Sequence, residues 1–474
     1  MNNNDVRENL VSGNIVKTML SLSIPAILGM IIIGLYNFMD AMFVGRMVGP
    51  DAMTAVKVSY PFTLMNNGIA TLIGMGSASV LSRAIGKKDQ ETIDKIMGNL
   101  IALVLILSAV VMAVGLIFTK PLLTLCGAKG NILIEANRYL KVVFLGSIFV
   151  NFAQSSNMIM RGEGKLKQAM LIMGSGAIFN IILDPILIIA FGKENGILGA
   201  AVATVTAQVF QAIWALIYFT KQSDKVKIHR IGVIGSITGP VLNVGISAML
   251  MQVMTMVQQT VMYHTVEHWG GSAWQTILGA ALSLQSFAFI PLWGISQGYQ
   301  PAIGTNYGAK EFGRVRSFNR VFMIAATILA AVFYIPIMAA PNTMLSMFIT
   351  DSAIAVKGAP MLRVLFAPYI TYGVLILMIT FFQAIGKGGN AAILTVLRQV
   401  LLFLPLVMLL PHVFARSVEG VFYAQLITDV IILLFGMILM INSFRNFRGD
   451  EKTLSTQQEQ KSLHKTNDPV IEPT

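Results

Sequence analysis

The sequence predicts an all-α polytopic membrane protein with twelve transmembrane helices in two pseudo-symmetric six-helix bundles. Of its 474 residues, 55% are hydrophobic and only 12% are charged, which is about half the charged fraction of ordinary soluble proteins. Apolar runs of the length that spans a bilayer, about 20 residues, recur along the whole chain. The two halves of the sequence also match at a constant offset, which indicates a duplicated bundle.

Charged residues, glycines and prolines divide the apolar sequence into twelve segments. The expected spans are residues 15–45, 53–82, 94–119, 135–160, 167–191, 196–220, 237–265, 275–305, 318–341, 359–384, 391–411 and 417–443. The first run is longer than the apolar core of a signal peptide and has no evident cleavage site. We therefore expect it to remain in the mature protein as the first span.

The basic residues predict how these spans are oriented. Most of the 34 Lys and Arg lie at the termini and in the even-numbered connections, and short basic segments are retained on the cytoplasmic side of a membrane. Both termini are therefore expected in the cytoplasm. This topology accounts for the formal net charge of +12, and no nucleic-acid partner is expected.

An internal repeat divides the chain into two halves. Positions 222 residues apart carry the same amino acid at several glycines and lysines. These pairs are Gly76 and Gly298, Gly86 and Gly308, Lys88 and Lys310, Gly164 and Gly386, and Lys165 and Lys387. Because each half holds an even number of spans, the two halves have the same orientation, as in transporters built from parallel repeats.

The predicted domains follow from this repeat and from changes in composition. They are an N-terminal lobe at 1–221, a charged cytoplasmic linker at 222–236, a C-terminal lobe at 237–448 and a disordered cytoplasmic tail at 449–474. Two lobes that meet at one cleft can rock against each other, which favours a transporter over a channel with a fixed pore.

Carboxylates inside apolar spans are the strongest sign of a functional site. Of the 22 acidic residues, only Asp40, Asp184 and Asp429 lie well inside apolar runs, where a charge is costly and a functional role is the default. Asn180 precedes Asp184 by one helical turn and shares its face. Pro185 frees the carbonyl one turn earlier and should kink the helix. The alternative is a protonated Asp184 that only hydrogen-bonds a neighbouring helix.

The first span adds two residues to this candidate site. Tyr36 lies one turn before Asp40, and Pro25 supplies a hinge earlier in the same span. We assign Tyr36 and, from the fourth span, Asn157 to the substrate cavity.

A polar stripe on the sixth span is a further candidate. Thr204, Gln208 and Gln211 are spaced by four and three residues, so they share one helix face. Small residues around them permit close approach of a neighbouring helix. The stripe is interpreted either as part of the ion and substrate site or as ordinary hydrogen bonding between helices.

Asp429 departs from this pattern because it lies in the C-terminal lobe. It follows Gln425 by one turn in the last span, and Arg398 in the span before it is the expected counter-charge. A buried ion pair that holds the lobe together is one interpretation, and a second proton site is the other.

Neither a bound metal nor an organic cofactor is expected. The single cysteine, Cys126, excludes an internal disulfide and any multi-cysteine metal site. His264 and His268 have a spacing compatible with metal binding but lack a third ligand in the sequence around them. No GxxxxGK[ST] motif for ATP occurs in the cytoplasmic connections.

Several segments together resemble the multidrug and toxic-compound extrusion (MATE) family, from about residue 10 to residue 445. They are SIPAILGMIIIGLYNFMDAMFVGR at 23–46, GMGSASVLSRAIGKK at 74–88, RGEGK at 161–165, NIILDPILI at 180–188 and GILGAAVAT at 196–204. The resemblance implies two six-helix bundles that extrude organic cations against protons or sodium ions.

The resemblance also implies a set of cation-coupling residues. The branch of the family with an aspartate in the first helix uses an Asn and an Asp in the fifth helix and a Thr in the sixth, which fall on Asp40, Asn180, Asp184 and Thr204 here. Another branch places acidic residues in helices seven and ten. Spans 237–265 and 359–384 contain no embedded carboxylate, so this second set is not expected.

The sequence thus predicts a secondary active exporter rather than an enzyme. It should export lipophilic organic cations in exchange for H+, with Na+ as a competing ion at the same residues, by alternating access in a prokaryotic plasma (inner) membrane. We expect a monomer surrounded by membrane lipid, with the coupling ion as its only cofactor. The alternatives are a flippase for lipid-linked saccharides on a related fold, and a channel or non-transporting receptor.

Overall fold

The computed structural model describes residues 4–126, 128–192, 195–223, 225–349, 351–413 and 417–466, and all regular structure within these ranges is helical. The first half of the chain forms α1 (Asn4–Val11), α2 (Ile15–Phe43), η1 (Val44–Val48), α3 (Pro50–Lys87), α4 (Gln90–Leu125), α5 (Gly130–Leu145), α6 (Ser147–Gly162), α7 (Leu166–Phe191), α8 (Gly196–Ile217) and η3 (Tyr218–Gln222). The second half forms α9 (Gly235–Gly308), α10 (Phe312–Ala339), α11 (Pro341–Ser346), α12 (Ser352–Phe366), η4 (Ala367–Thr371), α13 (Tyr372–Ala384), α14 (Gly388–Val396), η5 (Leu397–Leu401), α15 (Phe403–Val413) and α16 (Glu419–Thr466).

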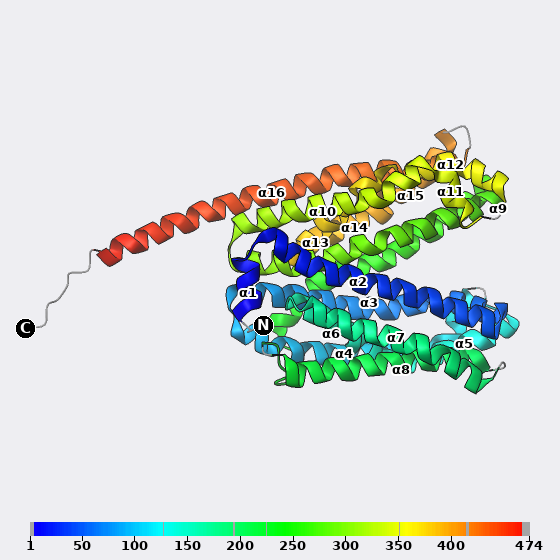
Figure 1. Cartoon of the computed structure of the whole chain (residues 1–474), viewed down its shortest axis with the longest axis horizontal. Coiled ribbons are helices and arrows are strands. Elements are labelled where there is room, and N and C mark those ends of the chain that lie inside the picture. Colours follow the sequence, from blue (N-terminus) through cyan, green and yellow to red (C-terminus); the bar gives the residue numbers. More distant parts are fainter. Residues whose placement is uncertain are drawn as a thin grey trace, which may run out of the picture.

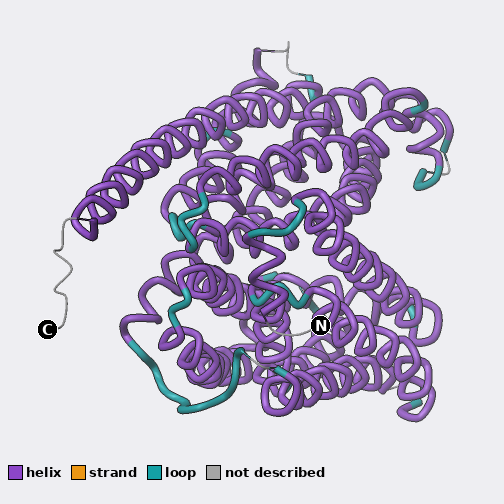
Figure 2. The backbone as a smooth tube through the Cα atoms, turned by 60° about the vertical axis from the view of Figure 1, so that its left-hand side comes forward, coloured by secondary structure: helices purple, strands orange, loops and turns teal. Residues whose placement is uncertain are grey.

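The helices gather into two bundles that lie side by side (Figure 1). The N-terminal lobe consists of α2 to η3, and the C-terminal lobe consists of α9 to α16. Helix α2 runs along the junction and contacts both α7 and α9. The bundles remain distinct in a second view, in which helices make up nearly all of the tube (Figure 2).

The number of spans agrees with the prediction. Within the described ranges, ten helices are long and apolar enough to cross a membrane, and the bent pair of α5 and α6, which meet at 56°, adds one more span. Helix α9 has 74 residues and a length of about 110 Å, which exceeds the roughly 30 Å of hydrocarbon in a bilayer. Its backbone leaves helical geometry at Gly271, with φ 71° and ψ −169°. Gly271 therefore divides α9 into two spans, and the all-α twelve-span fold is confirmed.

The structure differs from the sequence prediction at some helix ends. The short helices α1 and α11 were not expected, and α16 continues as a helix to Thr466, whereas a disordered tail was predicted from residue 449. Residues 450–466 contain no glycine or proline, and several are good helix formers, so the helix can propagate beyond the apolar span. The rest of the predicted tail, 467–474, lies outside the described residues.

The repeat is visible in the backbone itself. Lys88 and Lys310 are the two described non-glycine residues with positive φ, at 59° and 61°. Gly164 and Gly386 have φ values of 86° and 82°. The left-handed region is unfavourable for a residue with a Cβ. Because this conformation recurs 222 residues apart, equivalent helices in the two halves end in the same way.

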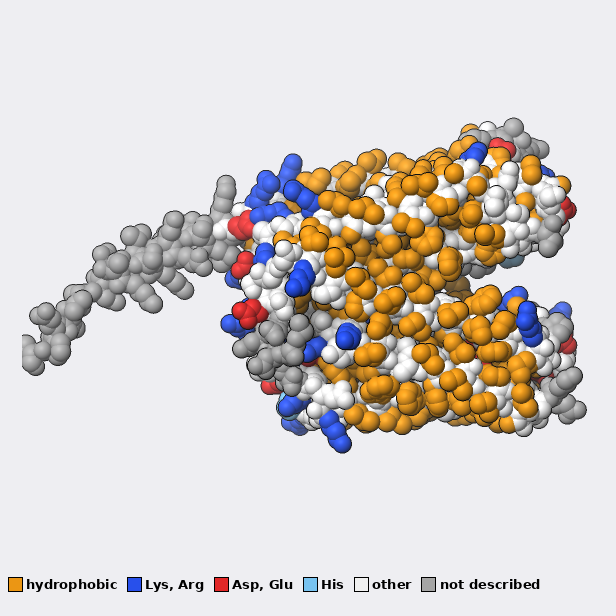
Figure 3. Space-filling view, viewed as in Figure 1, with side chains coloured by type: hydrophobic (Ala, Val, Ile, Leu, Met, Phe, Trp, Pro, Cys, Tyr) orange, Lys and Arg blue, Asp and Glu red, His pale blue; other side chains and the backbone are white. Residues whose placement is uncertain are grey.

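The lobes touch most closely at one end of the molecule. A Cβ added to Gly86 on α3 would lie 2.1 Å from the Thr305 carbonyl oxygen of α9, and one added to Gly308 would lie 2.2 Å from the Arg83 carbonyl oxygen. This end also carries α1 and the extension of α16 (Figure 1), and we call it the terminal end. At the opposite end, the far end, a hollow separates the two lobes (Figure 3).

Helix α1 fastens the two lobes together at the terminal end. The Arg7 guanidinium donates to the carbonyl oxygens of Ile85 and Gly86 in the N-terminal lobe, each at 3.2 Å. From the C-terminal lobe, Arg314 donates to the carbonyl oxygens of Leu10 and Gly13 at 3.2 and 2.7 Å. These bonds satisfy carbonyl oxygens at helix ends. Through them, the eight residues of α1 connect one lobe to the other.

The start of the inter-lobe linker is held by a buried carboxylate. Glu163, between α6 and α7, is 2% exposed and accepts from the Tyr218 hydroxyl at 3.0 Å and the Ser223 hydroxyl at 3.4 Å. Ser223 in turn accepts from the Val226 backbone N–H at 3.1 Å. Burial raises the pKa of the Glu163 carboxyl above its ordinary value, against the opposing effect of Lys165 and Lys225.

The raised pKa of Glu163 predicts a stability that falls with rising pH. The folded protein favours the protonated carboxyl, so this contribution is complete below the ordinary pKa of 4.5 and is lost as pH rises through the raised pKa. Glu163→Gln, which keeps a neutral side chain, should gain thermal stability relative to the parent as pH rises above 4.5. Melting of the purified protein in detergent measures this, with the exposed Glu91→Gln as the control. A difference in melting temperature that does not change with pH would contradict it.

The lone thiol tests the predicted orientation. Cys126 is exposed and follows α4 at the far end. With the termini in the cytoplasm, a membrane-impermeant maleimide should label it from outside intact spheroplasts. The control is Gln90→Cys in a Cys126→Ser background, because Gln90 is exposed at the start of α4 on the terminal side. Labelling of Cys126 only after the inner face is opened would reverse the topology.

Candidate functional site

The structure brings together the two embedded aspartates of the N-terminal lobe. Asp184 on α7 is completely buried, and Asp40 lies near the far end of α2. Their carboxyl groups are in hydrogen-bonding contact. Two carboxyl groups form such a bond only when one of them is protonated, because two charged carboxylates would repel each other. At this distance the two carboxyl groups can share one proton.

Asn180 connects this pair to α8. Its amide nitrogen donates to Asp184 Oδ1 at 3.3 Å. Rotating the amide by 180° would place the nitrogen 2.8 Å from Asp184 Oδ2 and the oxygen 3.2 Å from the backbone nitrogen of Thr204. The rotated amide satisfies both of its ends, so the aspartate pair, Asn180 and Thr204 lie in one group.

Two tyrosines border the pair. The Tyr36 side chain on α2 hydrogen-bonds the Thr204 side chain and lies close to both aspartates. Tyr139 on α5 is 8% exposed and also lies next to Asp40 and Asp184. Sequence reasoning missed Tyr139, because its position depends on how α5 packs against α2 and α7. Four helices thus contribute polar side chains to one point in an apolar bundle.

The rest of the polar stripe on α8 lies progressively farther from this point. Gln211 donates to the Met173 carbonyl oxygen of α7 at 3.1 Å and packs on Gly176, which is eight residues and so about 12 Å along α7 from Asp184. This is the hydrogen bond between helices that the sequence allowed as the simpler interpretation. The Oε1 atom of Gln208 is buried and has no hydrogen-bond partner among the described residues, so it can still receive a donor.

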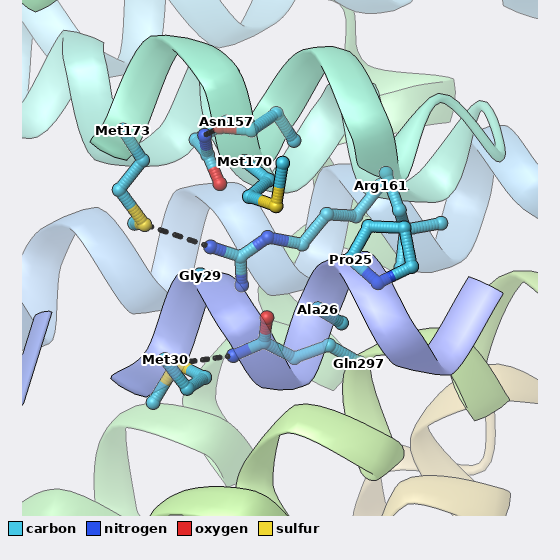
Figure 4. Close-up of a pocket in the computed structure, with 11 residues that line it drawn as sticks. Pro25, Ala26, Gly29, Met30, Asn157, Arg161, Met170, Met173 and Gln297 are labelled. Carbon is cyan, nitrogen blue, oxygen red and sulfur yellow. Dashed lines mark hydrogen bonds between the residues drawn. The ribbon is translucent and has the colours of Figure 1, made fainter. Parts of the chain in front are cut away.

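Asn157 lies toward the terminal end, away from Tyr36, and its assignment to the substrate cavity stays a prediction. Its amide donates to the Ala169 carbonyl oxygen at 2.7 Å, about 22 Å along α7 from Asp184. It borders a small cavity at the junction of the lobes, where the Arg161 guanidinium lies between Met173 and Gln297 (Figure 4). Asn157 is remote from Asp40 because α6 presents it toward α7 at the terminal end.

The two predicted hinge prolines lie in different settings. Pro25 borders the same small cavity as Asn157 (Figure 4), and Pro185 directly follows Asp184. Both lie inside helices that continue past them. Their role as hinges stays a prediction.

The C-terminal lobe contains the expected ion pair. Arg398 Nε donates to Asp429 Oδ1 at 2.7 Å, and the aspartate is completely buried. The other carboxylate oxygen accepts from Gln425 Nε2 at 2.7 Å and from the Tyr372 hydroxyl. Tyr372 had no signal in the sequence, because it lies in another part of the chain and meets Asp429 only through packing. Asp429 therefore has its lone pairs satisfied in addition to its counter-charge.

No arrangement in the described ranges offers a conventional metal site, since no group of three or more His, Cys, Asp or Glu comes together there. Oxygen ligands for a hard monovalent cation gather instead around Asp40 and Asp184, with Asn180 and Thr204 beside them.

Comparison with known families agrees with this geometry. The family model MatE matches residues 25–186 and 247–409, which are corresponding stretches of the two lobes and cover more than half of the chain. The chain belongs to the MatE family. The match includes Asp40, Asn180 and Asp184 in the first lobe and Arg398 in the second.

Relatives with an assigned activity are transporters. The chain is 27% identical over 426 residues to the multidrug export protein MepA of Staphylococcus aureus strain N315, covering 90% of this chain and 93% of the relative. It is 25% identical over 429 residues to MepA of Staphylococcus saprophyticus, covering 90% and 94%.

Solved structures of MATE transporters share the fold. An outward-facing conformation of a multidrug resistance MATE family transporter superposes with a TM-score of 0.87 at 24% identity, covering 93% of this chain and 98% of the other. A MATE crystal structure in complex with MaD5 gives 0.85 at 25% identity with the same coverage. A transporter from Pyrococcus furiosus, described as having a binding pocket of reversed polarity, gives 0.88 at 24%, covering 94% and 99%.

Loss of the Asp429 carboxylate should destabilise the C-terminal lobe. Asp429→Asn leaves Arg398 without its counter-charge in a largely buried position, which should cost on the order of 3 kcal/mol. Membrane abundance and the melting temperature in detergent measure the effect, and Asp51→Asn, at an exposed aspartate at the start of α3, is the matched control. Normal abundance and melting together with lost ion coupling would instead make Asp429 a second proton site.

Proposed function

We propose that this protein is a secondary active multidrug exporter that releases lipophilic organic cations in exchange for H+. Membership of the MatE family supports export. The chain also matches, over nearly their whole length, relatives that are called multidrug export proteins. The proposal places the chain as a monomer in a prokaryotic plasma membrane with both termini in the cytoplasm.

The observation that carries this proposal is the contact between Asp40 and Asp184. In the protonated state, the shared proton neutralises one carboxyl group, and the pair carries a single negative charge. When the proton leaves, two negative charges lie at hydrogen-bonding distance in an apolar bundle, and the cost of this arrangement favours either a new cation or a change of conformation. An organic cation that enters the cleft would compensate the second charge.

Proton and substrate can in this way compete for the same pair of charges. Competition at one site, combined with two arrangements of the lobes, is sufficient for exchange, because each ligand shifts the equilibrium only through its different affinity for the two arrangements. The hollow between the lobes at the far end gives the substrate a path out, and the close contact of α3 and α9 closes the terminal end.

Na+ is proposed as a competing occupant rather than as the driving ion. Thr204 and Asn180 add oxygen atoms beside the two carboxyl groups, which a hard cation requires and a proton does not. Both of these groups already have partners within the site, the Tyr36 hydroxyl and the Asp184 carboxyl. A sodium ion would therefore have to displace existing hydrogen bonds, while a proton uses the contact as it stands.

Transport from proteoliposomes tests the function and the coupling ion together. Under an imposed pH gradient without sodium, the parent protein should move ethidium, and Asp40→Asn and Asp184→Asn should each reduce the rate at least about tenfold. The double variant should be hardly slower than either single one, because residues that act as one unit are not additive. Asp51→Asn, at an exposed aspartate at the start of α3, serves as the matched control.

Two results would overturn the proposal. Absence of transport under the pH gradient, with recovery under a sodium gradient alone, would replace H+ by Na+. Partial losses that add in the double variant would mean that Asp40 and Asp184 belong to separate sites.

A further inference from the structure

A second cavity lies in the C-terminal lobe, away from the aspartate pair. It encloses about 300 Å³ between the two halves of α9, the π-helical turn η5 and α16, which is at the lower end of the range for small-molecule sites. Met30 of α2 also lines it, so the cavity reaches the junction of the lobes. Its wall combines apolar side chains with amides, hydroxyls and one guanidinium.

The charge that this cavity presents is positive. Arg398 lines the cavity and its side chain is 14% exposed, whereas Asp429 behind it is completely buried and is not part of the wall. The aspartate uses both oxygens on Arg398, Gln425 and Tyr372. A guanidinium has five N–H groups in a planar fork; Arg398 uses Nε on Asp429 and also hydrogen-bonds the Tyr372 side chain, which leaves further N–H groups. The cation therefore has donors to offer on the cavity side.

The neighbouring Gln399 presents an acceptor to the same cavity. Thr255 donates its hydroxyl hydrogen to the Met251 carbonyl oxygen at 2.7 Å, so its oxygen must accept from Gln399 Nε2, also at 2.7 Å. This fixes the orientation of the amide. Gln399 Oε1 is then left buried with no hydrogen-bond partner among the described residues, on a side chain that is 5% exposed and lines the cavity. A buried acceptor without a donor is costly.

Aromatic rings lie beside these polar groups. Phe289 and Trp293 line the cavity. Phe289 stacks on Tyr372 with ring centres 5.2 Å apart and an interplanar angle of 23°, and the Arg398 guanidinium lies 5.1 Å from the centre of the Tyr372 ring. The π-helical turn η5 carries both Arg398 and Gln399, and turns of this kind often occur at functional sites because they redirect side chains.

We infer that this cavity is a second ligand site, for flat aromatic compounds that carry a carboxylate and an N–H group. The carboxylate pairs with the free donors of Arg398, the N–H satisfies Gln399 Oε1, and the ring lies against Phe289 and Trp293. The site prefers organic anions and zwitterions, so its charge preference is opposite to that of the aspartate pair. Binding here is independent of ion coupling and is measured without any gradient.

Three dansyl compounds of similar shape test the charge preference. Dansylglycine has a naphthalene ring, a sulfonamide N–H and a carboxylate, its methyl ester is neutral, and dansylcadaverine is a cation. Fluorescence titration of the detergent-purified full chain should give binding of dansylglycine that is about tenfold or more tighter than binding of the ester. Equal affinities for all three compounds, or tightest binding of dansylcadaverine, would overturn the inference.

Variants then locate the site. Gln399→Leu removes the free acceptor and should weaken dansylglycine binding about fivefold. Gln275→Leu, at a glutamine outside the cavity that hydrogen-bonds Glu267, should leave binding unchanged. The paired change Arg398→Gln with Asp429→Asn removes both charges, so no charge is left buried without a partner. It should abolish the preference for dansylglycine over its ester.

The outcomes separate this site from the exporter proposal. If Gln399→Leu melts at the same temperature as the parent and still binds dansylglycine with unaltered affinity, the compound binds elsewhere and the inference is wrong. If the paired variant does not elute as a folded protein, the ligand series and Gln399→Leu still decide. Because no ion gradient is present, failure of proton-driven ethidium transport would leave these results unaffected.

Discussion

A polar group inside hydrocarbon must find its partners within the protein, and this constraint accounts for most of the contacts described above. Asp184 meets Asp40 and Asn180, and Asp429 meets Arg398, Gln425 and Tyr372. In both lobes the partners come from different helices. An embedded carboxylate without a partner is costly, and this cost fixes which helices must lie next to each other. The positions where they meet are also the positions that carry polar groups for ions or ligands.

The two lobes solve this problem in different ways although they arise from one repeat. The N-terminal lobe places two carboxyl groups in contact, which is stable only with an additional cation. The C-terminal lobe contains its own cation, Arg398, and therefore needs none. The backbone remains symmetric, as Lys88 and Lys310 show by their shared left-handed conformation, while the charges have diverged. A duplicated fold can thus carry a pair of carboxyl groups in one lobe and an ion pair in the other.

Contact between the lobes is concentrated where side chains are absent. Gly86 and Gly308 occupy equivalent positions in the repeat and let α3 and α9 approach until backbone meets backbone. Helix α1 adds hydrogen bonds to both lobes at the same end. Such a junction has few flexible side chains that could adapt gradually, so it favours two discrete arrangements over continuous deformation.

The amino-acid sequence by itself determined the twelve spans, the division into two equivalent halves and which aspartates lie inside the spans. These follow from local physics, because apolar length and the cost of a buried charge are properties of a segment and do not require knowledge of its neighbours. The pairing of Arg398 with Asp429 was also accessible, since so few charges lie inside the spans. Only the tertiary structure decided that Tyr139 borders the aspartate pair, that Asn157 lies about 22 Å along α7 from it, and that Gln399 is left with a free acceptor. These positions depend on how each helix is rotated and how deep it lies against its neighbours. Small differences in shape between apolar side chains set both, and such differences leave no period or motif in the sequence.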